Sequence, residues 1–168
     1  MSYIVSKVFE ESFQSDSTQS TARHGGIWAK KITKLPRLIL LEGAVGSGKT
    51  VWVQGFISTY LKKKNIVSSP SYSLINYYSA GKKEVIHADF YRLQSADDLE
   101  SVGFWDLLTP KRVIIVEWGL SLSSEIWPKG LSIDVVSFEI LSETKRLLKI
   151  KSSGFFNGGR GFRKGTRK

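Results

Sequence analysis

The chain has 168 residues, which is typical of one domain, and 41% of them are apolar, which excludes a wholly disordered protein. It has no cysteine and no apolar run as long as a membrane span, so disulfides and thiolate chemistry are excluded, and we expect a cytoplasmic protein without a membrane partner. The net charge is +10, of which residues 154–168 contribute +5 and residues 1–153 the other +5, so charge alone does not indicate a nucleic-acid-binding domain.

The N-terminal part contains two predicted elements. Residues 3–9, YIVSKVF, are rich in β-branched and aromatic residues and predict a strand. A polar segment follows, in which Asp16 or Ser17 could cap a helix over residues 17–32. Two adjacent glycines within this range weaken the prediction of a helix.

The next two predicted elements flank a glycine-rich loop. Residues 38–42, LILLE, form a short apolar run between a proline and a glycine, which is typical of a strand buried on both faces. After Gly48, apolar side chains recur at spacings of three and four and predict a helix with one buried face. Gly55 would cost this helix about 1 kcal/mol relative to alanine, so other contacts must stabilise it. The predicted buried face consists of Val53, Phe56, Ile57, Tyr60 and Leu61.

Further strands and a short helix are predicted in the second half of the chain. Residues 72–78 and 84–90 flank a turn-like segment and predict a hairpin. Residues 97–105 predict a short helix and a turn. The remaining strands are predicted at residues 113–116, which form a second fully buried strand, and at residues 131–138 and 145–151.

The C-terminal segment, residues 154–168 (GFFNGGRGFRKGTRK), is rich in glycine and basic residues. We expect one folded domain over residues 1–153, followed by this segment as a disordered tail. The basic residues of the tail are Arg160, Arg163, Lys164, Arg167 and Lys168.

The segment GAVGSGKT at residues 43–50 fits the phosphate-loop pattern G-x-x-x-x-G-K-[ST]. Its glycines allow successive backbone N–H groups to turn inward around an anion, and the following helix adds its positive end. Lys49 would carry a charge to the β and γ phosphates, and Thr50 would offer its hydroxyl to Mg²⁺. A chance match in a glycine-rich turn is disfavoured by the strand before and the helix after. The expected nucleotide-binding residues are Gly43, Ala44, Val45, Gly46, Ser47, Gly48, Lys49, Thr50 and Val51.

Two further clusters carry acids. Glu117 follows the buried strand at residues 113–116, where a phosphate-loop protein needs an acid near the magnesium ion, although a strand-end acid can also be an ordinary surface residue. Asp89 could position the attacking water, bind magnesium through water or form a structural pair with Arg92. Sequence periodicity does not distinguish between these three roles. His87 is interpreted as a packed residue, because the chain has only two histidines and no histidine metal site.

Four segments in this order and spacing resemble the bacterial TsaE family of tRNA threonylcarbamoyladenosine biosynthesis proteins. They are GAVGSGKT, SPSYSLINYY, HADFYRLQSADDLESVGFWDLL and VIIVEW, and the resemblance covers roughly residues 3–153. It implies an α/β, P-loop NTPase-like three-layer fold with a mixed, mostly parallel sheet and antiparallel edge strands. It further implies a Mg²⁺-dependent ATP hydrolase, with ATP and Mg²⁺ as cofactors, that is weak alone and stimulated by partners. The implied partners are the TsaD and TsaB proteins, whose machinery ATP hydrolysis would reset between turnovers, and tRNA indirectly.

The resemblance also implies roles for single residues. Lys49 matches the phosphate-binding lysine, Thr50 and Glu117 match the magnesium site, and Asp89 matches an essential aspartate, so the expected catalytic residues are Asp89, Glu117 and Lys49. Ser71 lies in a switch-like segment facing the nucleotide, where the family commonly has threonine, and Trp118 matches a tryptophan beside the site.

Three other functions compete with this interpretation. A small-molecule P-loop kinase carries the same loop, but usually adds an arginine-bearing lid that is not evident here. A GTPase is disfavoured because no N-K-x-D signature occurs. In an RNA-binding accessory module the basic tail would be the functional part, whereas a solvated terminus without a function is the simpler interpretation of the tail.

Overall fold

The computed structural model of the chain describes residues 8–64, 67–128 and 130–153. The basic tail therefore lies outside the described residues, as do positions 3–7 of the first predicted strand. The strands are β1 (Val8–Ser15), β2 (Arg37–Glu42), β3 (Ile75–Ala80), β4 (Lys83–Asp89), β5 (Arg112–Glu117), β6 (Ser132–Ile140) and β7 (Arg146–Ser153). The helices are α1 (Thr18–Lys31), α2 (Lys49–Tyr60) and α3 (Ala96–Ser101), with short 3₁₀ helices η1 (Phe104–Leu107), η2 (Gly119–Ser121) and η3 (Ser124–Ile126).

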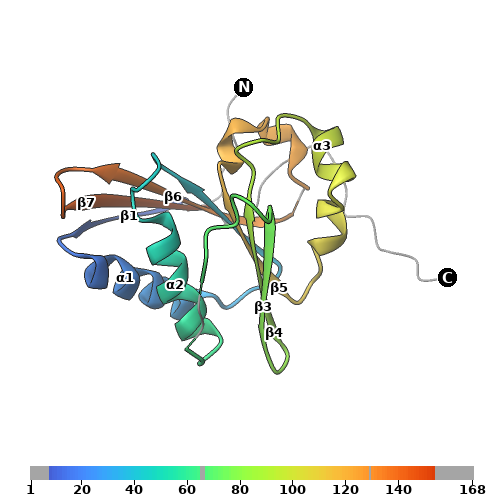
Figure 1. The fold of residues 1–168 in the computed structure, drawn as a ribbon. Coiled ribbons are helices and arrows are strands. Elements are labelled where there is room, and N and C mark those ends of the chain that lie inside the picture. Colours follow the sequence, from blue (N-terminus) through green and yellow to red (C-terminus); the bar gives the residue numbers. More distant parts are fainter. Residues whose placement is uncertain (1–7, 65–66, 129, 154–168) are drawn as a thin grey trace.

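The seven strands form one sheet in the order β1-β7-β6-β2-β5-β4-β3. The four central strands, β6, β2, β5 and β4, are parallel to one another, whereas β3 at one edge and β7 and β1 at the other pair antiparallel. Figure 1 shows this twisted sheet. The predicted α/β fold, with a mixed sheet and antiparallel edges, is confirmed. The parallel arrangement brings the C-terminal ends of β2, β4 and β5 to one edge, where open α/β sheets bind their ligands.

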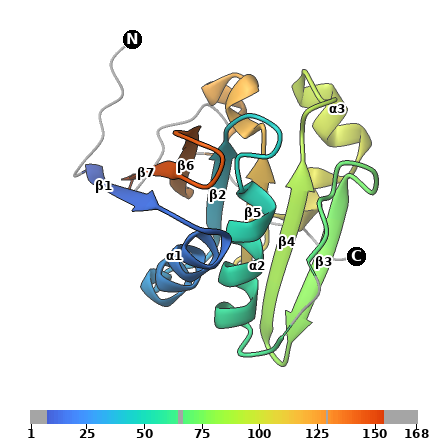
Figure 2. The same cartoon turned by 60° about the vertical axis from the view of Figure 1, so that its left-hand side comes forward.

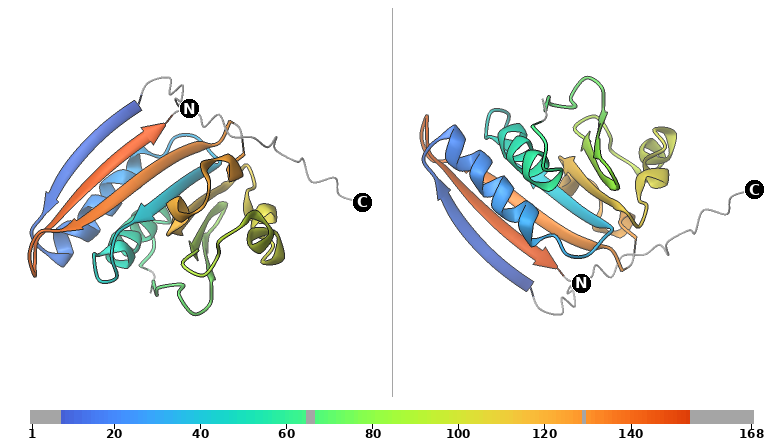
Figure 3. Two further views of the ribbon diagram at one scale, coloured as in Figure 1. Left: turned by 90° about the horizontal axis from the view of Figure 1, so that it is seen from above. Right: turned by 90° about the horizontal axis from the view of Figure 1, so that it is seen from below.

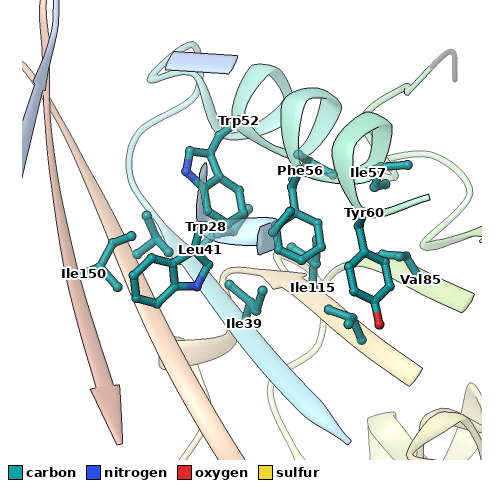
Figure 4. Close-up of a cluster of buried hydrophobic side chains, with 14 of the residues drawn as sticks. Trp28, Ile39, Leu41, Trp52, Phe56, Ile57, Tyr60, Val85, Ile115 and Ile150 are labelled. Carbon is teal, nitrogen blue, oxygen red and sulfur yellow. The ribbon is translucent and has the colours of Figure 1, made fainter. Parts of the chain in front are cut away.

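Helices cover both faces of the central sheet and make it the middle of three layers. Helices α1 and α2 lie on one face (Figures 2 and 3). Their side of the core includes Trp28, Trp52 and Phe56, which pack against Ile39 and Leu41 of β2 (Figure 4). The other face is covered by α3 and the 3₁₀ helices through a second cluster, which includes Leu99, Phe104 and Trp127 together with Leu38 and Leu40. Alternate β2 residues thus enter opposite clusters, as expected for a strand buried on both faces.

Close packing of α1 against α2 explains two helical glycines. A Cβ atom at Gly55 would lie 1.8 Å from the backbone oxygen of Ala22, and one at Gly25 would lie 2.1 Å from that of Trp52. Both distances are too short for non-bonded atoms, and the atoms that would be met belong to the backbone of the facing helix, which cannot move aside. Gly55 lowers the intrinsic helix propensity of α2, but it allows α1 and α2 to pack more closely than any larger residue would permit.

The first strand differs from the prediction. It spans Val8–Ser15 and shares only Val8 and Phe9 with the predicted range 3–9. It includes polar residues because it is an edge strand paired with β7: Phe13 stacks on His24 beneath it, whereas Glu10 on the other face is exposed. The helix after it agrees with the prediction and begins at Thr18, where the Ser17 side chain caps the backbone N–H of Ser20.

The helical face predicted for α2 is confirmed, since Val53, Phe56, Ile57 and Tyr60 are all buried, and so is Leu61 just beyond it. The predicted hairpin is formed by β3 and β4, although β3 begins at Ile75 and not at residue 72, because residues 72–74 lie in the preceding turn. The predicted short helix is formed by α3 and η1. No helix among the described residues is long and apolar enough to cross a membrane.

Candidate active site

The phosphate loop connects β2 directly to α2. Gly43, Gly46 and Gly48 all have positive φ angles, of 152°, 77° and 103°, which favour glycine. At Gly43 there is also no room for a side chain, because a Cβ atom would lie 2.7 Å from Ser47 Oγ and 2.8 Å from the carbonyl oxygen of Phe138 on β6. The loop is thus folded tightly against the sheet edge.

Lys49 is the first residue of α2 and is buried at the loop. Its Nζ donates hydrogen bonds to the carbonyl oxygens of Gly43 (2.6 Å) and Ala44 (3.0 Å). Burial lowers the pKa of the Lys49 ammonium from its ordinary value, while the negative charges of Glu117, Asp89 and Glu42 oppose that shift. The site therefore holds a partly desolvated cation among three acids.

A hydroxyl without a partner lies inside the same loop. Ser47 is fully buried, and its Oγ makes no hydrogen bond among the described residues. The first N–H groups of α2 lack helical acceptors, as at any helix N-terminus, and carry the positive end of the helix dipole. A buried hydroxyl, free N–H groups and a lysine together fit a phosphate group, which supplies acceptors to all three.

Two carboxylates end neighbouring parallel strands at the same edge. Asp89 is the last residue of β4 and Glu117 the last of β5, the two are register partners, and each is 4% exposed. Asp89 Oδ1 accepts a hydrogen bond from the backbone N–H of Tyr91 (2.9 Å), and Oδ2 accepts one from Ser71 Oγ (2.6 Å). Ser71 therefore lies beside Asp89. The alternative pair of Asp89 with Arg92 does not form, because Arg92 is exposed and makes no ion pair among the described residues.

Glu117 has a partner that the sequence did not suggest. His87, two residues before Asp89 on β4, is fully buried, and its Nε2 lies 2.9 Å from Glu117 Oε1. His87 is packed within the sheet, as predicted, but it also contacts an expected magnesium ligand. The contact depends on the parallel register of β4 and β5, which sequence periodicity does not reveal.

Trp118 lies beside the lysine in an unusual backbone conformation. Its φ angle is +64°, which is rare for a bulky residue, and its ring lies 5.0 Å from Lys49 Nζ. Tyr91 packs edge-to-face on this ring at 5.4 Å and is itself largely exposed. Tyr91 was not among the expected site residues, because the segment after Asp89 gave no signal for this contact.

A pocket of about 380 Å³ opens beside the phosphate loop. It lies between the N-terminus of α1, the loop and the β6–β7 turn, and the guanidinium of Arg146 donates a hydrogen bond to the carbonyl oxygen of Gly46 (3.3 Å). Arg146 stands 100 residues from Gly46 in the chain, so no local pattern could associate them. The residues that line the pocket include Thr18, Thr21, Gly46, Gly48, Val51 and Arg146.

Glu42 ends β2 beside the loop and is held by Leu120, whose backbone N–H donates to Glu42 Oε1 (2.7 Å). Burial raises the pKa of the Glu42 carboxyl, while the hydrogen bond from Leu120 and the charge of Lys49 oppose this shift. Glu42 thus adds a third acid at the edge that carries Asp89 and Glu117.

A divalent metal would find few protein ligands here. No group of three or more His, Asp or Glu side chains that could hold a metal occurs within residues 8–64, 67–128 and 130–153. Mg²⁺ usually keeps several waters and takes one or two carboxylates plus substrate phosphates. Thr50, in the first turn of α2, and Glu117 fit this mode of binding, because the phosphates would complete the coordination.

Comparison with known proteins finds a matching family model, similar curated proteins and a solved structure of similar fold. The family model described as "Threonylcarbamoyl adenosine biosynthesis protein TsaE" matches residues 15–148. Similar curated proteins are tRNA threonylcarbamoyladenosine biosynthesis proteins TsaE of Aquifex aeolicus, 34% identical over 71% of this chain and 80% of that protein, and of Rickettsia typhi, 27% identical over 83% and 94%. The crystal structure of Bacillus subtilis YdiB matches the fold with a TM-score of 0.64, at 23% identity and 89% coverage of both chains.

Proposed function

The chain belongs to the TsaE family of threonylcarbamoyl adenosine biosynthesis proteins, and from this premise we propose that it is a Mg²⁺-dependent ATPase serving tRNA N6-threonylcarbamoyladenosine formation. We propose that its hydrolysis of ATP drives turnover of a complex of TsaD and TsaB, and that it contacts tRNA only through that complex. Its relatives from Aquifex and Rickettsia carry names from this pathway. Because ATP and tRNA are both cytoplasmic, we propose that the protein acts in the cytoplasm.

One observation carries the proposal. The phosphate loop with Lys49 and the paired carboxylates Asp89 and Glu117 converge on one edge of the sheet, although they come from three different strand ends. A loop that binds phosphate needs a nearby acid for a hydrolytic reaction, and here two lie side by side. Phosphate binding alone does not require two carboxylates buried next to a lysine. Burying a carboxylate costs free energy, and ionisable groups that are buried in spite of this cost occur often at functional sites.

In the proposed reaction the loop N–H groups, Ser47 and Lys49 bind the phosphates. Thr50 and Glu117 would hold Mg²⁺, which when bound neutralises charge on the phosphates. Asp89 is the residue we assign to the attacking water, because its carboxylate stands next to Glu117 and accepts hydrogen bonds that fix its orientation. Trp118 covers the lysine and limits access of bulk water.

The nucleoside part of ATP would occupy the pocket next to the loop. Gly46, Gly48 and Val51 belong both to the phosphate-binding segment and to the lining of this pocket. Its polar lining includes Thr18, Thr21 and Arg146, together with the acids Asp16 and Glu143, and its volume of about 380 Å³ is within the range of small-molecule sites. The hydrogen bond from Arg146 to Gly46 would couple occupation of the pocket to the shape of the loop.

Hydrolysis assays with the purified full chain test this proposal. We expect phosphate release from ATP with Mg²⁺ to be slow for the chain alone and faster with a TsaD–TsaB pair. Transfer of phosphate to a small-molecule acceptor, without a response to the protein pair, would instead identify a P-loop kinase. Failure to bind any nucleotide would contradict the assignment of the loop itself.

A further inference from the structure

The buried contact between His87 and Glu117 calls for an explanation beyond packing. His87 stands on β4 between Val85 and Asp89, on the α2 side of the sheet, with its side chain fully buried. Its Nε2 meets Glu117 Oε1 at 2.9 Å, while its Nδ1 is buried and has no hydrogen-bond partner among the described residues. An apolar residue would fill this position without an unpaired nitrogen, so packing alone does not account for the histidine.

The two ring nitrogens of His87 have different surroundings, and this difference fixes the direction of the hydrogen bond to Glu117. A carboxylate can only accept a hydrogen bond, so Nε2 is the donor in this pair. Nδ1 has no hydrogen-bond partner among the described residues, so the hydrogen bond that the ring makes there is the one from Nε2 to Glu117. His87 therefore presents one fixed N–H to one oxygen of Glu117. The other oxygen, Oε2, accepts no hydrogen bond from the described residues.

We propose that His87 is a positioning residue that orients the Glu117 carboxylate so that Oε2 is directed to the magnesium ion or to one of its waters. This inference rests on the proposed function, because it assumes that Glu117 serves a metal. A carboxylate at a strand end can rotate about its side-chain bonds, and a fixed donor on one oxygen limits that rotation. Because the donor lies on the neighbouring strand in register, it needs no loop to hold it.

Three variants separate positioning from packing. His87→Gln keeps an N–H donor at the position of Nε2, since the two side chains reach it through the same number of bonds. His87→Asn keeps a polar amide that is too short to reach Glu117, and His87→Phe keeps the ring without a donor. Each variant is first checked for folding by circular dichroism, and the Asn variant substitutes for the Phe variant if the latter does not fold.

The readout is metal binding rather than activity alone. Mn²⁺ is titrated into the full chain with ADP, free Mn²⁺ is followed by electron paramagnetic resonance, and ADP affinity is measured separately in EDTA. We expect His87→Phe and His87→Asn to weaken Mn²⁺ binding roughly 10- to 100-fold, as loss of an outer partner of a metal ligand does. ADP affinity in EDTA should be unchanged, and His87→Gln should recover most of the metal affinity.

Two outcomes would overturn the inference. Equal Mn²⁺ affinity in wild type, Phe and Asn variants would leave His87 a packing residue. Equal losses of ADP affinity with and without metal would indicate a general distortion of the site. A wild-type protein that binds ADP without any effect of Mn²⁺ would contradict the metal site of the proposed function itself, which distinguishes that failure from the failure of His87.

Discussion

Asp89 and Glu117 are register partners at the ends of the neighbouring parallel strands β4 and β5, and both are nearly inaccessible to solvent. Each carboxylate has its own partner: Asp89 is held by Ser71 and by the backbone N–H of Tyr91, and Glu117 by His87. The two acids therefore enter the site from a rigid sheet in separate, fixed orientations. This separation suits one acid for the metal and the other for the water.

Isosteric amide substitutions test this division of roles. We expect Asp89→Asn and Glu117→Gln to lower the rate of ATP hydrolysis by roughly 100-fold or more, since a positioned acid or base contributes about that much. ATP affinity should fall much less, because the phosphate loop is intact. Single-turnover hydrolysis and isothermal titration measure the two quantities separately. Normal hydrolysis by Asp89→Asn in the presence of the partners would refute its catalytic assignment.

Lys49→Met should weaken nucleotide binding severely while sparing the fold. Loss of a charge-assisted contact to phosphate costs about 2–3 kcal/mol, which is roughly a 30- to 160-fold loss of ATP affinity. The control is Lys149→Met on β7, an exposed lysine paired with Glu139 far from the phosphate loop in the chain, which should bind ATP like wild type.

The same substitution has a signed effect on stability. The pKa of Lys49 is lowered by burial, so between its folded value and the ordinary 10.5 the unfolded chain binds more protons than the folded one. At neutral pH the buried charge of Lys49 therefore lowers the free energy of unfolding of the wild type. This loss disappears as the pH rises through the window. Urea unfolding at pH 7.5 should show Lys49→Met to be at least as stable as wild type, with any advantage shrinking towards pH 10. A markedly less stable variant would mean that Lys49 supports the fold.

Gly55→Ala should destabilise the protein despite the higher helix propensity of alanine. The gain of about 1 kcal/mol in propensity is outweighed, because the new Cβ would lie 1.8 Å from the Ala22 carbonyl oxygen and force α1 and α2 apart. The matched control is Gly26→Ala, where the nearest atom is the movable Thr59 Oγ1 at 2.6 Å. Thermal unfolding should place Gly55→Ala well below Gly26→Ala, and the reverse order would contradict the close helix packing.

His24 should make the protein less stable in mild acid. Burial lowers its pKa, with the Lys31 charge acting in the same direction and Glu11 opposing, and its Nδ1 accepts a hydrogen bond from Trp52 Nε1 (3.0 Å). Between the folded pKa and 6.5 the unfolded chain binds more protons, so stability is fully present above pH 6.5 and declines as the pH falls through this window. His24→Asn retains an acceptor but does not titrate. The urea midpoint should fall less between pH 7.5 and 5.5 in this variant than in wild type, and parallel profiles would exclude His24 as the cause.

Local features allowed much of the fold to be predicted. The apolar strand, the glycine loop and the amphipathic helix are contiguous, so LILLEGAVGSGKT and the residues after it specify β2, the loop and α2 without long-range information. Glu117 could be placed at the same edge because it follows a second fully buried strand. The polar edge strand β1 was predicted too early in the chain, since half of its side chains face solvent and give little apolar pattern.

Other features depend on contacts between distant residues. Helix propensity alone indicates that Gly55 is unfavourable in α2. The structure shows why glycine is required there, because the backbone of α1 at Ala22 leaves no room for a Cβ atom. The proximity of Asp89 and His87 to Glu117 requires β4 and β5 to be neighbours in a particular register, and the pocket needs Arg146 beside Gly46. Periodicity describes which face a side chain occupies, but not which strand lies next to it.

The measurement that tests the central claim most directly counts modified adenosines formed per TsaD–TsaB complex in a reconstituted reaction with tRNA, ATP and Mg²⁺. If ATP hydrolysis by this chain resets the complex, wild type should support many modifications per complex, whereas Glu117→Gln should leave the yield near a single turnover. Equal multiple-turnover yields with wild type, with Glu117→Gln and without the chain would contradict the account.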